Sequence, residues 1–139
     1  MSRIRLLLLV LFLSLTGLPF TSCFSQSAGS GYFDAGAQDL NVTGEQMAKY
    51  VLYRFDTGAA GRTLTLPAAA DIIKQIGSPT VGQMFIVAVS AEGANIVTVT
   101  GGSGVTVKTS GATVPGNSTK NLYFVVTDLT SGSQALTVY

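Results

Sequence analysis

The sequence has no histidine and no tryptophan, and it contains a single cysteine. Without histidine, neither a Ser-His nor a Cys-His catalytic pair can form, and a zinc site built from Cys and His is excluded. The lone Cys23 has no second cysteine with which to form an internal disulfide. These absences remove common catalytic and metal-binding chemistries, and the sequence predicts neither a cofactor nor a metal.

Charge is also scarce, because Asp, Glu, Lys and Arg make up only 11 % of the 139 residues. Soluble domains usually contain roughly 25 % of these residues. The formal net charge is +1, and the sequence has no basic cluster of the kind that binds nucleic acid. We therefore expect no nucleic-acid partner. A surface with few charges is easily desolvated, which suits packing against other proteins.

Apolar residues are abundant, and the longest run of them lies near the N-terminus. Arg3 and Arg5 precede Leu6 to Phe24, 19 residues without a charge. That length is close to the roughly 20 residues needed to span a bilayer. The run predicts a hydrophobic helix that is either a retained anchor or a cleaved secretory signal peptide. A third alternative makes Cys23 a lipidation site, since "FTSC" approximates a bacterial lipobox.

The chain divides by composition into three parts: 1–24 as the hydrophobic segment, 25–48 as a linker and irregular arm, and 49–139 as a β-domain. In the last part, short apolar or alternating segments recur every 8–12 residues or so, separated by turn residues. This pattern predicts an all-β fold, a single β-sandwich or jelly-roll-like domain of seven or eight strands. A small closed barrel is the alternative that the pattern leaves open.

One short helix is expected within the β-domain. Pro67 ends a strand and suits the first turn of a helix. The apolar residues that follow have the i, i+3, i+4, i+7 spacing of an amphipathic helix, and they are Ala69, Ile72, Ile73 and Ile76. Asp71 lies in the first turn, where the helix dipole favours an acid. Gly77 is the expected residue just after the helix C-terminus.

Two later segments are unusually apolar. Gln83 to Ala91 has apolar residues at the positions of both faces, which predicts a central strand covered on both sides. The second segment, "KNLYFVVTDL", contains Tyr123, and the chain ends in Tyr139. These two tyrosines are candidates for an outer face, where aromatic side chains often mark protein contacts.

Several motifs between Arg62 and Tyr139 follow one another in a recognisable order. They are "TLTLP", a short helix with a small-x-x-Ile pattern, "VGQMF", "NIVTV", "GSGV" and "LTSGSQALTVY". Together they resemble a β-domain that recurs in virion structural proteins of tailed phages and of large double-stranded DNA viruses of algae and protists. The resemblance covers more than half of the chain and brings no catalytic residues. It implies a capsid, decoration or fibre role.

The sequence and this resemblance together predict a non-enzymatic virion protein. We expect a minor capsid or capsid-associated protein of a large DNA virus, located at the internal membrane and capsid layer of the virion. Its expected partners are the major capsid protein lattice, further copies of itself, and the membrane through Leu6 to Phe24. The alternative is a β-sandwich adhesion or binding protein, secreted or lipid-anchored in the cell envelope, whose signal peptide is cleaved.

Asp56-Thr57-Gly58 matches the triplet that carries the catalytic aspartate of aspartic proteases. Such enzymes need two carboxylates that share a proton. Arg54 stands where that family has an apolar residue, and no later element is present to support such a site. Because Asp and Gly are ordinary turn residues, we expect Asp56 to lie in a hairpin turn.

Two N-glycosylation sequons begin at Asn41 and Asn117. Asn117 lies in a Pro-Gly-Asn-Ser segment, which predicts an exposed loop. It is therefore the better acceptor of the two if the domain crosses a membrane.

Overall fold

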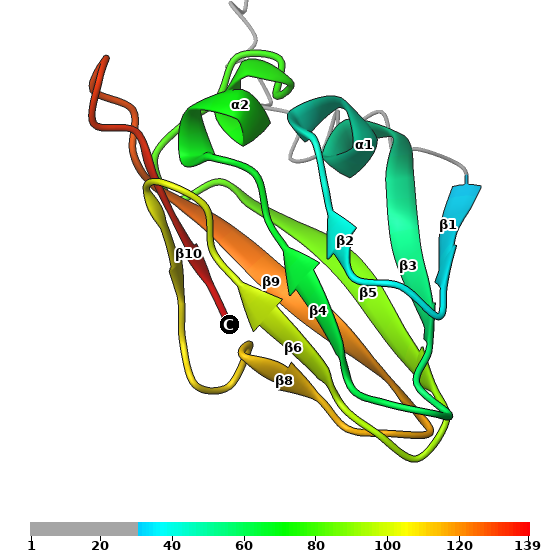
Figure 1. The fold of residues 1–139 in the computed structure, drawn as a ribbon. Coiled ribbons are helices and arrows are strands. Elements are labelled where there is room, and N and C mark those ends of the chain that lie inside the picture. The colour runs from blue at the N-terminus through cyan, green and yellow to red at the C-terminus, as the bar shows by residue number, and fades with distance from the viewer. Residues whose placement is uncertain (1–30) are drawn as a thin grey trace, which may run out of the picture.

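The computed structural model describes residues 31–139, which form two facing β-sheets and two short helices (Figure 1). The six-stranded sheet has the order β1 (Gly31–Gly36), β3 (Tyr50–Asp56), β5 (Met84–Glu92), β9 (Ser118–Asp128), β10 (Ala135–Val138) and β7 (Val105–Val107). The four-stranded sheet has the order β2 (Leu40–Asn41), β4 (Arg62–Thr65), β6 (Val97–Thr100) and β8 (Thr113–Val114). The predicted all-β fold class is confirmed.

The chain crosses from one sheet to the other after nearly every strand. Strands β1, β3 and β5 run parallel in the six-stranded sheet, and β2, β4 and β6 run parallel in the other. Three successive coils, each with one strand per sheet, therefore stack as in a short β-solenoid. The stack ends where the direction reverses, since β9 is antiparallel to β5 and β8 is antiparallel to β6.

Of the two predicted alternatives, β-sandwich and jelly roll, this topology differs from the jelly roll, which is built from antiparallel strands. Five of the eight strand pairs between residues 31 and 139 are parallel. The described strands number ten rather than seven or eight. Strands β2 and β8 have two residues each, which is too short to leave an alternating pattern in the sequence.

The expectation of an irregular arm over 25–48 is wrong for its described part, because this part belongs to the sandwich. It supplies β1, β2 and the start of helix α1 (Gly44–Lys49), and Val42 and Met47 are buried in the core. The helix begins with a capping box, in which Thr43 Oγ1 accepts from the Gln46 amide and Gln46 Oε1 accepts from the Thr43 amide. The sandwich therefore begins by residue 31 and not at residue 49.

The core lies between the sheets and follows the alternation that the sequence predicts. Tyr53 and Phe55 of β3 are fully buried, and so is Leu64 of β4 at 1 % exposure. Phe85 and Phe124, on paired strands, stack with ring centroids 4.7 Å apart. The inward face of each sheet is thus apolar, as required for two sheets that pack face to face.

Helix α2 (Ala69–Lys74) closes one end of this core, beside α1 (Figure 1). Its predicted apolar positions Ala69, Ile72 and Ile73 are buried, and Asp71 lies in its first turn as expected. The helix is shorter than predicted, since its C-cap is Gln75 and not the residue before Gly77. The structure therefore contains two short helices where the sequence predicted one.

Candidate functional site

The outer face of the six-stranded sheet has two chemically different ends. Because β1, β3 and β5 are parallel, all three begin at one end, which we call the leading end, and finish at the trailing end. Gly31, where the described chain starts, lies at the leading end with both helices (Figure 1). The two ends carry different candidate functions.

Charged side chains pair with one another at the trailing end. Arg54 on β3 donates to Asp34 on β1 at 3.0 Å and to Glu92 on β5 at 2.5 Å. The hydrogen bond from Arg54 holds the pKa of Glu92 below its ordinary value of 4.5, and the same bond raises the pKa of Arg54. All three side chains are more than 40 % exposed, so solvent screens the pairs and they contribute little to stability.

Asp56 lies in a tight turn at the trailing end. Its Oδ1 accepts a hydrogen bond from the Gly58 amide at 2.9 Å, the geometry of an Asx turn. The expected hairpin is wrong, because β3 and β4 belong to different sheets and the turn carries the chain across. Asn95 secures this crossing by donating from Nδ2 to the Thr57 carbonyl at 2.8 Å. The Asp-Thr-Gly triplet is thus accounted for by turn geometry.

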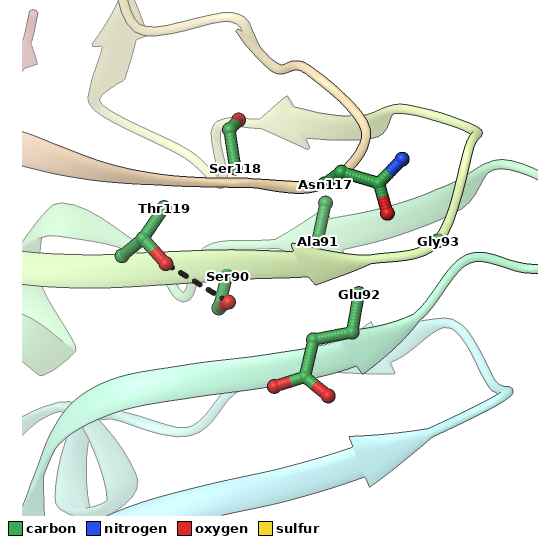
Figure 2. Close-up of a pocket in the computed structure, with 7 residues that line it drawn as sticks. All are labelled: Ser90, Ala91, Glu92, Gly93, Asn117, Ser118 and Thr119. Carbon is green, nitrogen blue, oxygen red and sulfur yellow. Dashed lines mark hydrogen bonds between the residues drawn. The ribbon is translucent and has the colours of Figure 1, made fainter.

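A shallow depression of about 430 Å³ lies at the trailing end between β5 and β9 (Figure 2). The hydroxyls of Thr119 and Ser90 bond each other across it at 3.0 Å. Glu92 is the titratable residue of the lining, and its carboxylate is directed toward Arg54 on β3. The lining therefore offers the hydroxyls of Ser90, Ser118 and Thr119 and one carboxylate, which Arg54 engages.

Large hydrophobic side chains remain exposed at the leading end. Of the eight such residues in the described part of the chain, Ile96 lies elsewhere and the other seven lie here. We call these seven the leading-end patch: Tyr32, Val51, Val81, Met84, Ile86, Tyr123 and Tyr139.

The strand register places the centre of this patch on the outer face. Ile86 on β5 is opposite Tyr123 on β9, and Tyr123 exchanges two backbone hydrogen bonds with Tyr139. Met84 and Ile86 are 41 % and 39 % exposed. The prediction that their strand is covered on both faces is therefore wrong within residues 31–139. The outer-face position predicted for Tyr123 and Tyr139 is confirmed, with 40 % and 47 % exposure.

The two sequons lie at different places on the sandwich. Asn117 is exposed in the turn before β9, at the trailing end, and has a positive φ of 53°. Asn41 is exposed at the end of β2, three residues before α1. Both are accessible as acceptors. The other candidate modification site, Cys23, lies outside the described residues.

Sequence patterns did not predict the charged triad, which consists of Asp34, Arg54 and Glu92. Its members are separated by 20 and 38 residues, and only the parallel pairing of β1, β3 and β5 brings them together. The patch did leave a signal, since the apolar residues on both faces of β5 indicate a second partner for that strand.

Two further observations concern residues 31–139 as a whole. No three His, Cys, Asp or Glu side chains gather there in a way that would hold a metal ion. No helix in that range is long and apolar enough to cross a bilayer, and the predicted hydrophobic helix over 1–24 lies outside it.

Comparisons with protein-family models, curated proteins and solved structures found no match.

Proposed function

We propose that the protein is a non-enzymatic structural component of a virion. In this proposal it is a minor capsid or capsid-associated protein of a large DNA virus, anchored to a membrane by its N-terminal segment. The β-sandwich would then be a packing unit that contacts neighbouring capsid proteins and further copies of itself.

The observation that supports this proposal is the leading-end patch. Monomeric soluble proteins rarely leave a large contiguous apolar area exposed, and such areas usually mark contacts with proteins or membranes. The patch combines three tyrosines with Met84 and Ile86, and aromatic residues and Met are enriched in interfaces. Its centre lies on the outer face of a sheet, which suits contact with an extended surface.

The viral part of the proposal rests on the sequence motifs. In the fold they occupy structural positions: Leu64 and Leu66 of "TLTLP" are buried, as are Val97 and Val99 of "NIVTV". Gly102 of "GSGV" lies so close to Pro67 that a Cβ atom would stand 2.7 Å from its carbonyl carbon. The motifs thus specify packing of the sandwich, which is what a shared structural domain requires.

The test is to isolate the chain from its native source, and to determine both its intact mass and the fraction in which it sediments. The proposal expects a mass that corresponds to Met1–Tyr139, or lacks only the initiator Met, in particles that contain membrane. A mass beginning near Phe24 or Gln26, in a soluble or cell-envelope fraction, would overturn it. The alternative of an adhesion or binding domain with a cleaved signal peptide would then be preferred.

A further inference from the structure

We propose that the leading end of the sandwich lies directly against the lipid bilayer, with the leading-end patch at the headgroup level. This inference rests on the membrane anchoring in the proposed function. It adds that the β-domain itself is a membrane-contacting surface with a fixed orientation, in which the trailing end faces away from the lipid.

The position at which the chain enters the sandwich supports this orientation. Gly31 opens β1 at the leading end. Only six residues separate it from Phe24, the last residue of the apolar segment. Six extended residues span about 20 Å at most. If Leu6 to Phe24 is in a bilayer, the leading end is therefore held close to the surface of that bilayer.

The composition of the apolar segment favours lipid over the sheet as its surroundings. Leu6 to Phe24 has no charged residue, and its polar side chains are four small hydroxyls, Ser14, Thr16, Thr21 and Ser22. A helix that packs on a sheet needs one apolar stripe and a polar side toward water, whereas one that is apolar all round is buried on every side. The outer face of the sandwich could cover only one side of such a segment.

The chemistry of the patch is that of a membrane interface. Tyr32, Tyr123 and Tyr139 each combine an apolar ring with a hydroxyl, and tyrosine is enriched where hydrocarbon meets the headgroups. Val81, at 64 % exposure, extends the patch into the loop before β5. The exposed ion pairs of Arg54 lie on the trailing side of the patch, beginning with Asp34 two residues after Tyr32, and this orientation turns them toward water.

The charges beside the patch are few and of mixed sign. Helices α1 and α2 carry exposed Glu45, Lys49, Asp71 and Lys74 at the leading end, two acids and two bases. Lys49 lies over the Tyr50 ring, with Nζ 5.3 Å from the ring centroid. With Asp128 at the end of β9, the leading end has three acids and two bases, a small net charge that a zwitterionic bilayer does not repel, so we choose phosphatidylcholine as the probe.

The absence of native tryptophan makes a direct test straightforward. The full chain carries a single reporter, either Ile86→Trp in the patch or Ser90→Trp as the matched control. Both positions are on β5 and share its outer face, about 13 Å apart along the strand. Each variant is reconstituted in phosphatidylcholine vesicles, recovered by flotation, and compared with and without brominated acyl chains. Tyr123→Trp, opposite Ile86, replaces the first variant if that one does not fold.

We expect the brominated lipid to remove most of the Ile86→Trp emission and to leave the Ser90→Trp emission unchanged. If the chain floats with the vesicles and neither reporter is quenched, the inference is overturned while the anchoring survives. In that case a blue-shifted but unquenched Ile86→Trp emission identifies a protein, such as a second copy, as the occupant of the patch. Equal quenching of both reporters also overturns the proposed orientation. Failure of the chain to float overturns the anchoring in the proposed function together with this inference.

Discussion

Gly93 is a residue at the trailing end where the backbone leaves no room for a side chain. Its φ is +139°, and a Cβ atom would stand 2.4 Å from the Gly58 amide nitrogen. We expect Gly93→Ala to lower the free energy of unfolding by about 3 kcal/mol, from backbone strain and the forced separation of the two turns. Urea denaturation measures the loss.

Gly82→Ala is the matched control for this prediction. Gly82 also has a positive φ, +86°, but a Cβ atom there would meet nothing within 4 Å. The loss of unfolding free energy in Gly82→Ala therefore reports backbone strain alone, which amounts to about 1–2 kcal/mol. An equal effect of the two substitutions would show that the close approach of the Gly93 and Gly58 turns contributes nothing.

The ion pair between Arg54 and Glu92 makes the stability of the protein depend on pH. The lowered pKa of Glu92 decides the direction of this dependence. The pKa of Glu92 is lowered in the fold, so its pairing stabilises the protein above pH 4.5, its ordinary value. This contribution is lost as the pH falls through the lower, folded-state pKa. We expect wild type to lose stability between pH 5 and pH 3 more steeply than Arg54→Gln, measured as urea midpoints.

Asp128 serves as an internal reference for that measurement. The pKa of its carboxyl is also lowered, by hydrogen bonding to the Thr130 amide, and it titrates in both proteins. The wild type and Arg54→Gln should therefore both retain an acid transition, with the difference between them due to the triad. Identical pH slopes would show that Arg54 and Glu92 are not paired in solution.

Among the elements, α1 depends most on its first residues, because it has only six residues and one capping box. We expect Thr43→Ala to cost about 1 kcal/mol of stability, since the Gln46 amide loses its acceptor. Thermal unfolding of protein produced in bacteria measures this without a glycan. Thr43→Ser keeps the hydroxyl and should remain near wild type, and a loss as large as that of Thr43→Ala would point to the methyl group instead.

The strands show how far sequence patterns reach. The alternating segments form strands with one buried face, on which Tyr53, Leu64 and Val97 lie, because side-chain direction in a strand has a period of two. The same pattern does not report which strand lies alongside or in which direction it runs. Parallel coils and antiparallel hairpins therefore look alike along the chain, and the sequence left the choice between sandwich and jelly roll to the strand pairing.

On the outer side of β5 the sequence predicted a contact that residues 31–139 do not supply. Met84 and Ile86 suggested cover on both faces, and only the inner face has it within residues 31–139. This mismatch is the physical reason to look for a partner at the leading end. The site at the trailing end could not be foreseen in the same way, because Asp34, Arg54 and Glu92 share no local pattern.

At the scale of the whole molecule, the two sequons lie at opposite ends of the sandwich, and we expect them to differ in glycosylation. Asn117 lies at the trailing end, away from the proposed membrane, where a glycan would extend into water. Asn41 is close to α1 at the leading end, where a glycan would lie between the domain and the bilayer. When the full chain is made in eukaryotic secretory cells, we expect the folded protein to carry its glycan at Asn117.

The glycan at Asn117 is detected as a gel shift when the protein is deglycosylated enzymatically. Thr119→Ala removes the second sequon without altering the positive φ of Asn117, and it should abolish the shift. Asn41→Gln removes the first sequon and should leave the shift in place. The reverse pattern would contradict the proposed orientation, because it would require the leading end to be open to water. Absence of any shift in the wild type would contradict the prediction that Asn117 carries a glycan.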